Sequence, residues 1–207
     1  MRSITPLAAV GLLVLLGACG NIDSGPYASP DEVARAAYRS GGPPEITLYT
    51  MISNRSGAGA HSSILINASQ QVIFDPSGSV DFQDAPELDD VIYGVTPRIR
   101  EIYESAHARE TYHVRIQRLQ VAPEVAERAL RLAQSSGPVG ASMCASATSS
   151  VISNLPGFEG VGTTMFPNTL ADRFARIPGV DDRKLYESDS DDKARAIAFL
   201  EGDQPSQ

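Results

Sequence analysis

The chain has 207 residues and a formal net charge of −8 at pH 7, from 25 acidic and 17 basic residues. This length fits one domain with flexible ends and is sufficient to bury a hydrophobic core. The negative charge argues against nucleic-acid binding, because the phosphate backbone attracts basic surfaces.

The N-terminus has the three zones of an export signal. Arg2 supplies a positive charge, residues 4–16 are mostly apolar and uncharged, and small residues occupy positions 17–18. The apolar stretch is shorter than the about 20 residues that a permanent membrane-spanning helix needs. We therefore predict that residues 1–18 are a removable signal peptide.

The residues around Cys19 resemble a bacterial lipobox, in which Leu, two small residues and Cys stand in succession. The resemblance implies that Cys19 is lipidated and anchors the chain to a membrane of the cell envelope. Gly20 comes next, in place of the Asp that often retains lipoproteins in the inner membrane. We therefore expect the outer membrane, with the protein facing the periplasm.

Apolar periodicity and helix-capping residues predict an α+β fold, with a small antiparallel sheet packed against helices. Residues 79–90 are acidic and are predicted to be irregular. Strands are predicted at 46–52, 60–66, 71–74, 111–121 and 183–186. Helices are predicted at 29–38, 96–106, 122–134, 142–155, 167–177 and 193–200.

Beyond the signal peptide, the composition divides the chain into three parts. Residues 19–44 are predicted to be a lipidated tether with an N-terminal helix, and residues 45–180 a single domain. Residues 181–207 are rich in Asp and Glu, and we predict an acidic, partly disordered tail.

Cys144 is the first candidate catalytic residue. If Cys19 carries a lipid, Cys144 is the remaining free thiol, which points to a reactive group, an intermolecular bridge or a buried side chain. The Gly-Pro-Val-Gly stretch at 137–140 leads into the predicted helix, so Cys144 falls in its first turn. The partial positive charge of a helix N-terminus favours the thiolate, which is the nucleophilic form.

His61 and Asp75 are the candidate base and its orienting acid. His61 lies in the predicted strand 60–66, and Asp75 comes directly after the predicted strand 71–74. With a turn near residues 67–70, the hairpin would pair position 61 with position 75. Asp75 would then accept a hydrogen bond from the imidazole and fix its tautomer, as in catalytic triads.

Each candidate also has a structural interpretation. Cys144 shares a helical stripe with apolar residues, which is typical of a core position, and His61 fits a half-buried strand. Asp75 begins an Asp-Pro-Ser-Gly sequence, where Asp commonly bonds its own backbone in a turn. His107 at a helix end and His113 in mid-strand are alternative bases, although both positions favour structural roles.

The order of these elements resembles the circularly permuted papain-like cysteine hydrolases. That branch includes the lecithin–retinol acyltransferase-like enzymes and related bacterial lipoprotein hydrolases. The resemblance implies a permuted papain-like fold with Cys144 as nucleophile, His61 as base and Asp75 as the third member. It covers roughly residues 45–180, and its motifs are the segments 60–66, 72–75, 112–134, 143–146 and 165–170.

The resemblance implies a hydrolase or acyltransferase that acts on an amide, ester or thioester, with peptidoglycan peptides or lipids as candidate substrates. Two alternatives stay open. Many permuted members have Asn before the Cys, where this chain has Met143, which favours a non-catalytic binding protein. The other is a structural envelope lipoprotein acting through its acidic tail. The sequence predicts no cofactor or metal, since it has no His-x-x-x-His or Cys-x-x-Cys pair.

Overall fold

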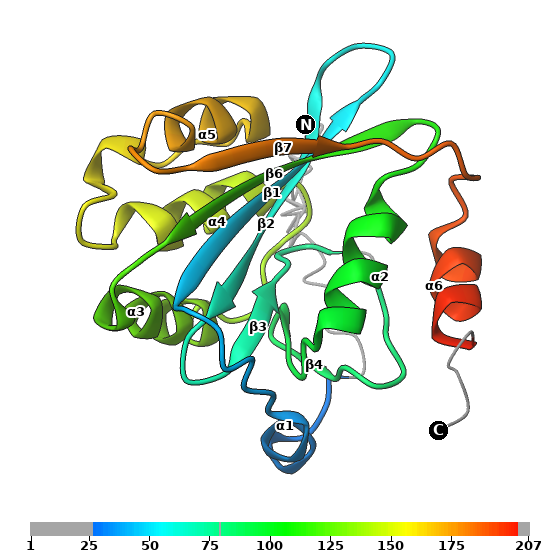
Figure 1. Cartoon of the computed structure of the whole chain (residues 1–207), viewed down its shortest axis with the longest axis horizontal. Helices are drawn as coiled ribbons and strands as arrows, with labels where there is room; N and C mark the ends of the chain where they lie inside the picture. Colours follow the sequence, from blue (N-terminus) through cyan, green and yellow to red (C-terminus); the bar gives the residue numbers. More distant parts are fainter. Residues whose placement is uncertain (1–26, 79, 203–207) are drawn as a thin grey trace, which may run out of the picture.

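The computed structural model describes residues 27–78 and 80–202. Within this part of the chain, the α+β prediction is confirmed by a seven-stranded antiparallel sheet with helices on both faces (Figure 1). The strand order is β4-β5-β3-β2-β1-β6-β7. The strands are β1 (Glu45–Ser53), β2 (Gly59–Asn67), β3 (Gln71–Phe74), β4 (Glu87–Leu88), β5 (Val91–Ile92), β6 (Tyr112–Gln120) and β7 (Asp181–Leu185).

The predicted helices are all present, with ends that differ by a few residues. Ser29 caps α1 in a capping box with Glu32, and the Thr96 side chain accepts from the Ile99 amide at the start of α2. The helices are α1 (Pro30–Ala36), α2 (Pro97–His107), α3 (Pro123–Gln134), α4 (Cys144–Ser153), η1 (Glu159–Val161), α5 (Pro167–Phe174) and α6 (Lys193–Gly202).

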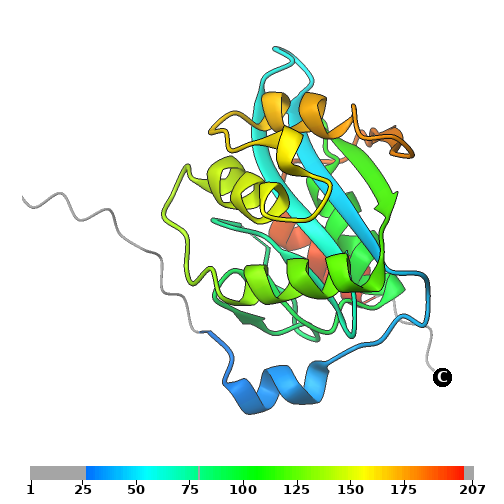
Figure 2. The same ribbon diagram turned by 90° about the vertical axis from the view of Figure 1, so that its left-hand side faces the viewer.

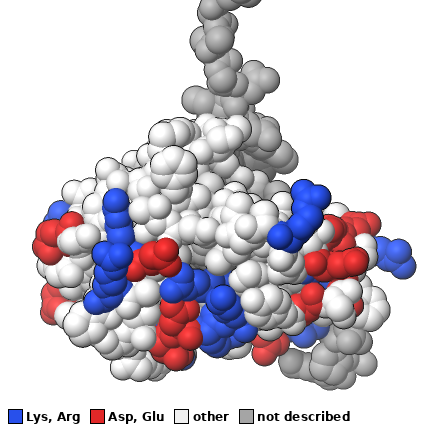
Figure 3. All heavy atoms as spheres, turned by 90° about the horizontal axis from the view of Figure 1, so that it is seen from above, with Lys and Arg blue, Asp and Glu red and all other residues white. Residues whose placement is uncertain are grey.

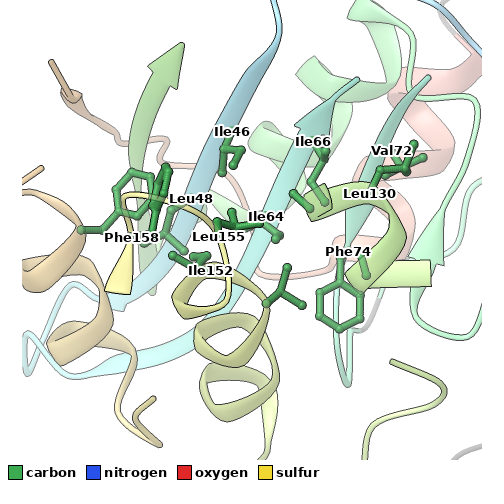
Figure 4. Close-up of a cluster of buried hydrophobic side chains, with 14 of the residues drawn as sticks. Ile46, Leu48, Ile64, Ile66, Val72, Phe74, Leu130, Ile152, Leu155 and Phe158 are labelled. Atoms are coloured by element: carbon green, nitrogen blue, oxygen red, sulfur yellow. The ribbon is translucent and has the colours of Figure 1, made fainter. Parts of the chain in front are cut away.

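Alternating side chains of the strands pack into two separate cores. One face of the sheet is covered by α3, α4 and α5, and the other by α2 and α6 (Figures 1 and 2). Figure 4 shows the first core, to which Ile64 and Ile66 of β2 and Ile152 of α4 all belong. On the opposite face, Leu65 packs with Tyr103 of α2. The period of two along each strand therefore decides which helices a residue contacts.

The C-terminal segment is joined to the domain. β7 extends the sheet by pairing with β6, and α6 packs against α2. A boundary at residue 180 therefore does not separate the tail from the sheet. No helix of the described residues is long and apolar enough to cross a membrane. The predicted signal peptide and the predicted lipidation site, Cys19, lie outside the described residues.

Residues 79–90 were predicted to be irregular, and this was wrong for the last part of the segment. β4 lies there and pairs with β5, which in turn pairs with β3. Each of the strands β4 and β5 has two residues, too few to give a periodic pattern. The pairing places Asp90 beside the end of β3, where its carbonyl accepts from the Asp75 amide at 2.8 Å.

Gly59 permits the close approach of α5 to the start of β2. A Cβ atom at Gly59 would lie 2.7 Å from Asn168 Oδ1 and 2.8 Å from Pro167 Cβ. Asn168 Nδ2 also donates to the Gly57 carbonyl at 2.8 Å, so the loop before β2 is tied to the same helix. This contact fixes the end of β2 that carries His61.

We predict that Gly59→Ala lowers the free energy of unfolding by about 1–3 kcal/mol, the usual cost of overpacking. The matched control is Gly160→Ala, since a Cβ atom at Gly160 has nothing within 4 Å. Urea unfolding of both variants and the wild type measures the difference. Equal stabilities of the two variants would contradict the role assigned to Gly59.

Candidate functional site

His61 and Asp75 form a buried ion pair. His61 Nε2 lies 2.5 Å from Asp75 Oδ1, and the two side chains are 17% and 2% exposed. His61 comes from β2, and Asp75 is the first residue after β3. The hydrogen bond expected between the two candidates is therefore present.

The way in which Asp75 reaches His61 differs from the expected pairing. Ile64 pairs with Phe74, so the same register would place Asp75 opposite Ser63, and the contact with His61 is diagonal. The predicted pairing of positions 61 and 75 was wrong by two residues, because the hairpin turn is centred on Ser69. Diagonal neighbours on one sheet face remain within reach of long side chains.

The sequence Asp-Pro-Ser-Gly does form a turn, but the Asp75 carboxylate takes part in the site as well. The Gly78 amide donates to the Asp75 carbonyl at 2.8 Å, and Ser77 has a φ of 58°. Meanwhile, Asp75 Oδ1 accepts from His61 and from Tyr103. A Cβ atom at Gly78 would lie 2.1 Å from Asp75 Oδ2, so glycine is required for the turn to close over the carboxylate.

Cys144 is the first residue of α4, as expected for a residue in the first helical turn. Its thiol is free and only 7% exposed. The helix is positioned by β2, whose ladder with β3 begins at Ile64 and leaves Ser62 unpaired on that side. The Thr148 hydroxyl donates to the Ser62 carbonyl at 3.1 Å. Cys144 therefore lies beside the strand position next to His61.

The predicted apolar stripe is also real. Val151 and Leu155 lie in the core on the α4 side of the sheet, and Ala147 packs against it. Cys144 itself is outside that cluster and interacts with His61. The later turns of α4 are therefore part of the hydrophobic core, as the structural interpretation of Cys144 expected. The first turn, which carries Cys144, contributes to the candidate site instead.

The electrostatics of the site favour a thiolate–imidazolium pair. Burial alone would lower the pKa of His61, but the charge and hydrogen bond of Asp75, together with Cys144, raise it to about 9. Burial would raise the pKa of Cys144, but His61 and hydrogen bonds from the Ser62 and Ala145 amides lower it below the ordinary 9.0. The N-terminus of α4 acts in the same direction. Both shifts act in the direction of proton transfer from Cys144 to His61.

The other two histidines have structural contacts of their own. Burial, and next the charge of Lys193, lower the pKa of His107 to about 3, so this side chain is neutral. Its Nδ1 donates to the Tyr103 carbonyl at 2.8 Å, and its ring stacks on that of His61. His113 lies on β6, where Nδ1 is 2.7 Å from Asn54 Oδ1.

Tyr103 is a site residue that the sequence did not indicate. Its hydroxyl lies 2.9 Å from Asp75 Oδ1 and 2.6 Å from Ser63 Oγ. The only available signal was a tyrosine on the apolar face of a predicted helix, where a buried hydroxyl requires a partner.

The segment before Cys144 is held by polar contacts from the β3–β5 side. Asp90 Oδ2 accepts from the Val139 amide at 2.7 Å, and Ser77 Oγ donates to the Gly140 carbonyl at the same distance. These contacts border a cleft of about 1010 Å³ that Cys144 does not line. Burial, and then the charges of Asp75 and Asp90, raise the pKa of Glu87 in this cleft to about 7. Among the described residues, no cluster of His, Cys, Asp or Glu is arranged to hold a metal ion.

We predict that Asp75→Asn moves the pH midpoint of Cys144 alkylation upward by about one unit or more, towards that of an ordinary thiol. Asn has no charge, so the pKa of His61 falls and the imidazolium no longer stabilises the thiolate. Timed iodoacetamide labelling read by mass spectrometry gives the midpoint. Asp84→Asn, which changes a carboxylate of the neighbouring cleft, is the control. An unchanged midpoint for Asp75→Asn would refute the assigned role.

Comparison with known proteins identifies no relative. No family model, no curated protein and no solved structure matches this chain. The resemblance to permuted papain-like hydrolases therefore rests on the order of the elements and on the residues of the site, and the family stays a prediction.

Proposed function

We propose that this chain is a cysteine hydrolase or acyltransferase with Cys144 as nucleophile, His61 as general base and acid, and Asp75 as the residue that orients His61. The observation that carries the proposal is the 2.5 Å contact of Asp75 with a histidine that also interacts with a thiol at a helix N-terminus. A core cysteine, a half-buried strand histidine and a turn aspartate would each explain one of the three residues. Nucleophilic catalysis explains why all three lie together.

The arrangement of the groups supports an acyl-transfer reaction in two steps. The Cys144 thiolate attacks the carbonyl carbon of an amide, ester or thioester and forms a carbon–sulfur bond. The His61 imidazolium protonates the leaving group as the tetrahedral intermediate collapses to a thioester on Cys144. Water, or an acceptor hydroxyl or amine, then gives a proton to His61, attacks the thioester and releases the acyl group, which returns the thiol to its resting state.

The start of α4 supplies the groups for the developing oxyanion. Met143, at the N-cap position, makes no side-chain hydrogen bond to the helix. The first backbone N–H groups of a helix lack intrahelical acceptors, so the Cys144 amide is available to a substrate oxygen. Such preorganised donors contribute strongly to acyl-transfer catalysis.

The segments that precede and follow Cys144 in the sequence favour an uncharged acyl group. Residues 136–171 contain one charged residue, Glu159. Met143, Met165 and Phe166 are exposed by 39%, 60% and 69%. Figure 3 views the side that carries α5 and the β1–β2 loop, and it shows a broad area without charged residues. A neutral, apolar acyl group would lose less hydration here than a charged peptide would.

A non-catalytic binding protein is the second candidate. Cys144 is nearly buried, and the cleft of about 1010 Å³ that Val139 and Ala141 help to line does not include Cys144. A binding protein would use that cleft and would not turn over an acyl substrate. The two functions differ in whether Cys144 becomes acylated.

We predict that incubation with a butyryl thioester adds one butyryl group to Cys144, and that a succinyl thioester reacts more slowly because of its charge. Cys144→Ala abolishes the adduct and lowers turnover by at least about 10³-fold. His61→Asn has a similar effect, whereas the control His113→Asn retains activity. Intact-protein mass spectrometry and thiol release measure both steps. Turnover that survives Cys144→Ala would exclude the enzymatic proposal.

We also propose that the protein is a lipoprotein of the cell envelope, anchored through Cys19, which is supported by the lipobox-like sequence alone. We predict that the chain, expressed in a bacterial host fed an alkyne analogue of palmitate, becomes labelled. Cys19→Ser removes the label, whereas Cys144→Ser retains it. Labelling that depends on Cys144 would identify an acyl-enzyme and would argue against the anchor.

A further inference from the structure

Tyr103 lies at the centre of a short chain of hydrogen bonds behind the site. It is fully buried on the face of α2 that packs against the sheet. Its hydroxyl is 2.9 Å from Asp75 Oδ1 and 2.6 Å from Ser63 Oγ. An ionised carboxylate only accepts, so the single hydroxyl proton of Tyr103 goes to Asp75, and Ser63 donates to Tyr103.

Tyr103 and His61 bind the same carboxylate oxygen. Both contacts converge on Asp75 Oδ1, and no described residue provides a hydrogen bond to Oδ2. A second donor on Oδ1 makes that oxygen less basic. Because the His61–Asp75 contact is short, the proton between them has two nearby sites, and the bond from Tyr103 favours the site on His61 Nε2.

We propose that Tyr103 is a positioning residue. Its hydroxyl holds the Asp75 carboxylate so that His61 keeps its proton on Nε2, which leaves the other ring nitrogen, Nδ1, to take the proton of Cys144. This role rests on the proposed function, since it matters only where His61 acts as a base. The site would then comprise Cys144 and His61, which react, Asp75, which orients His61, and Tyr103 of α2, which holds Asp75.

The ring of Tyr103 is held independently of its hydroxyl. It packs against Tyr49 with ring centroids 5.4 Å apart and against His107 with centroids 4.5 Å apart. His107 Nδ1 donates to the Tyr103 carbonyl, and the His107 ring lies 6.2 Å from that of His61 at an angle of 13°. Removing only the hydroxyl therefore leaves the packing around the site in place.

Tyr103→Phe tests the proposal, and Tyr49→Phe is a closely matched control. Tyr49 is also fully buried and touches the same ring, but its hydroxyl donates to Glu104 at 2.9 Å. The readouts are the pH profile of Cys144 alkylation and the nitrogen chemical shifts of the His61 ring. Several other titratable groups face Asp75 and are kept constant in both variants. They are His61 on β2, His107 on α2, Lys193 on α6, Glu87 on β4 and Asp90 before β5.

We expect the alkylation midpoint of Tyr103→Phe to move by about one pH unit from that of the wild type, which corresponds in free energy to the loss of one hydrogen bond to a charged group. At a pH above the His61 pKa of about 9, where the ring is neutral, the His61 nitrogen shifts should change from those of the Nε2-protonated tautomer in the wild type to those of a mixture in Tyr103→Phe. Tyr49→Phe should match the wild type in both measurements.

Unchanged profiles and shifts in Tyr103→Phe, or equal changes in the two variants, would overturn the role of Tyr103. The proposed function fails by a different result, namely a wild-type midpoint equal to that of an ordinary thiol. In that case the nitrogen shifts still decide whether Tyr103 fixes the His61 tautomer, because they require no reactive thiol.

Discussion

The unequal pairing of β2 is the constraint on which the site depends. β2 pairs with β1 from Gly59 to Asn67, but with β3 only from Ile64 onward. The backbone of Ser62 would therefore lie at an open strand edge, and buried backbone groups need partners. The N-terminal half of α4 provides them, through Thr148 and the Cys144 thiol. Satisfying this edge brings a helix N-terminus, a thiol and His61 to one place.

A second constraint fixes α2, which carries Tyr103. Glu104, one residue further along α2, accepts from Arg100 of the same helix and from Arg183 of β7. Arg100 also bonds Glu45 of β1. Glu45 and Glu104 are buried, so a rearrangement of α2 would leave a buried carboxylate without a partner, which is costly. The ionic cluster thus limits the movement of α2 relative to the sheet.

Much of the fold could be predicted from the sequence. Alternating apolar residues indicated β1 and β2, and helix-capping residues and prolines indicated the starts of α1, α2 and α3. The contact of His61 with Asp75 could also be predicted from the hairpin, whereas the place of Cys144 beside them was implied by the family resemblance. Local patterns could not give the register of β3, the two-residue strands or the partner of the Tyr103 hydroxyl. Those depend on contacts between residues far apart in the chain, which no short window contains.

The two ends of the sheet bear on how this protein behaves at high concentration. β7, at one edge, presents the exposed charges of Asp181, Asp182, Arg183 and Lys184, and β4, at the other edge, has two residues. Short or charged edges resist pairing with strands of other molecules. Such edges discourage aggregation between the sheets of different molecules. Many copies can therefore lie close together while each remains separately folded.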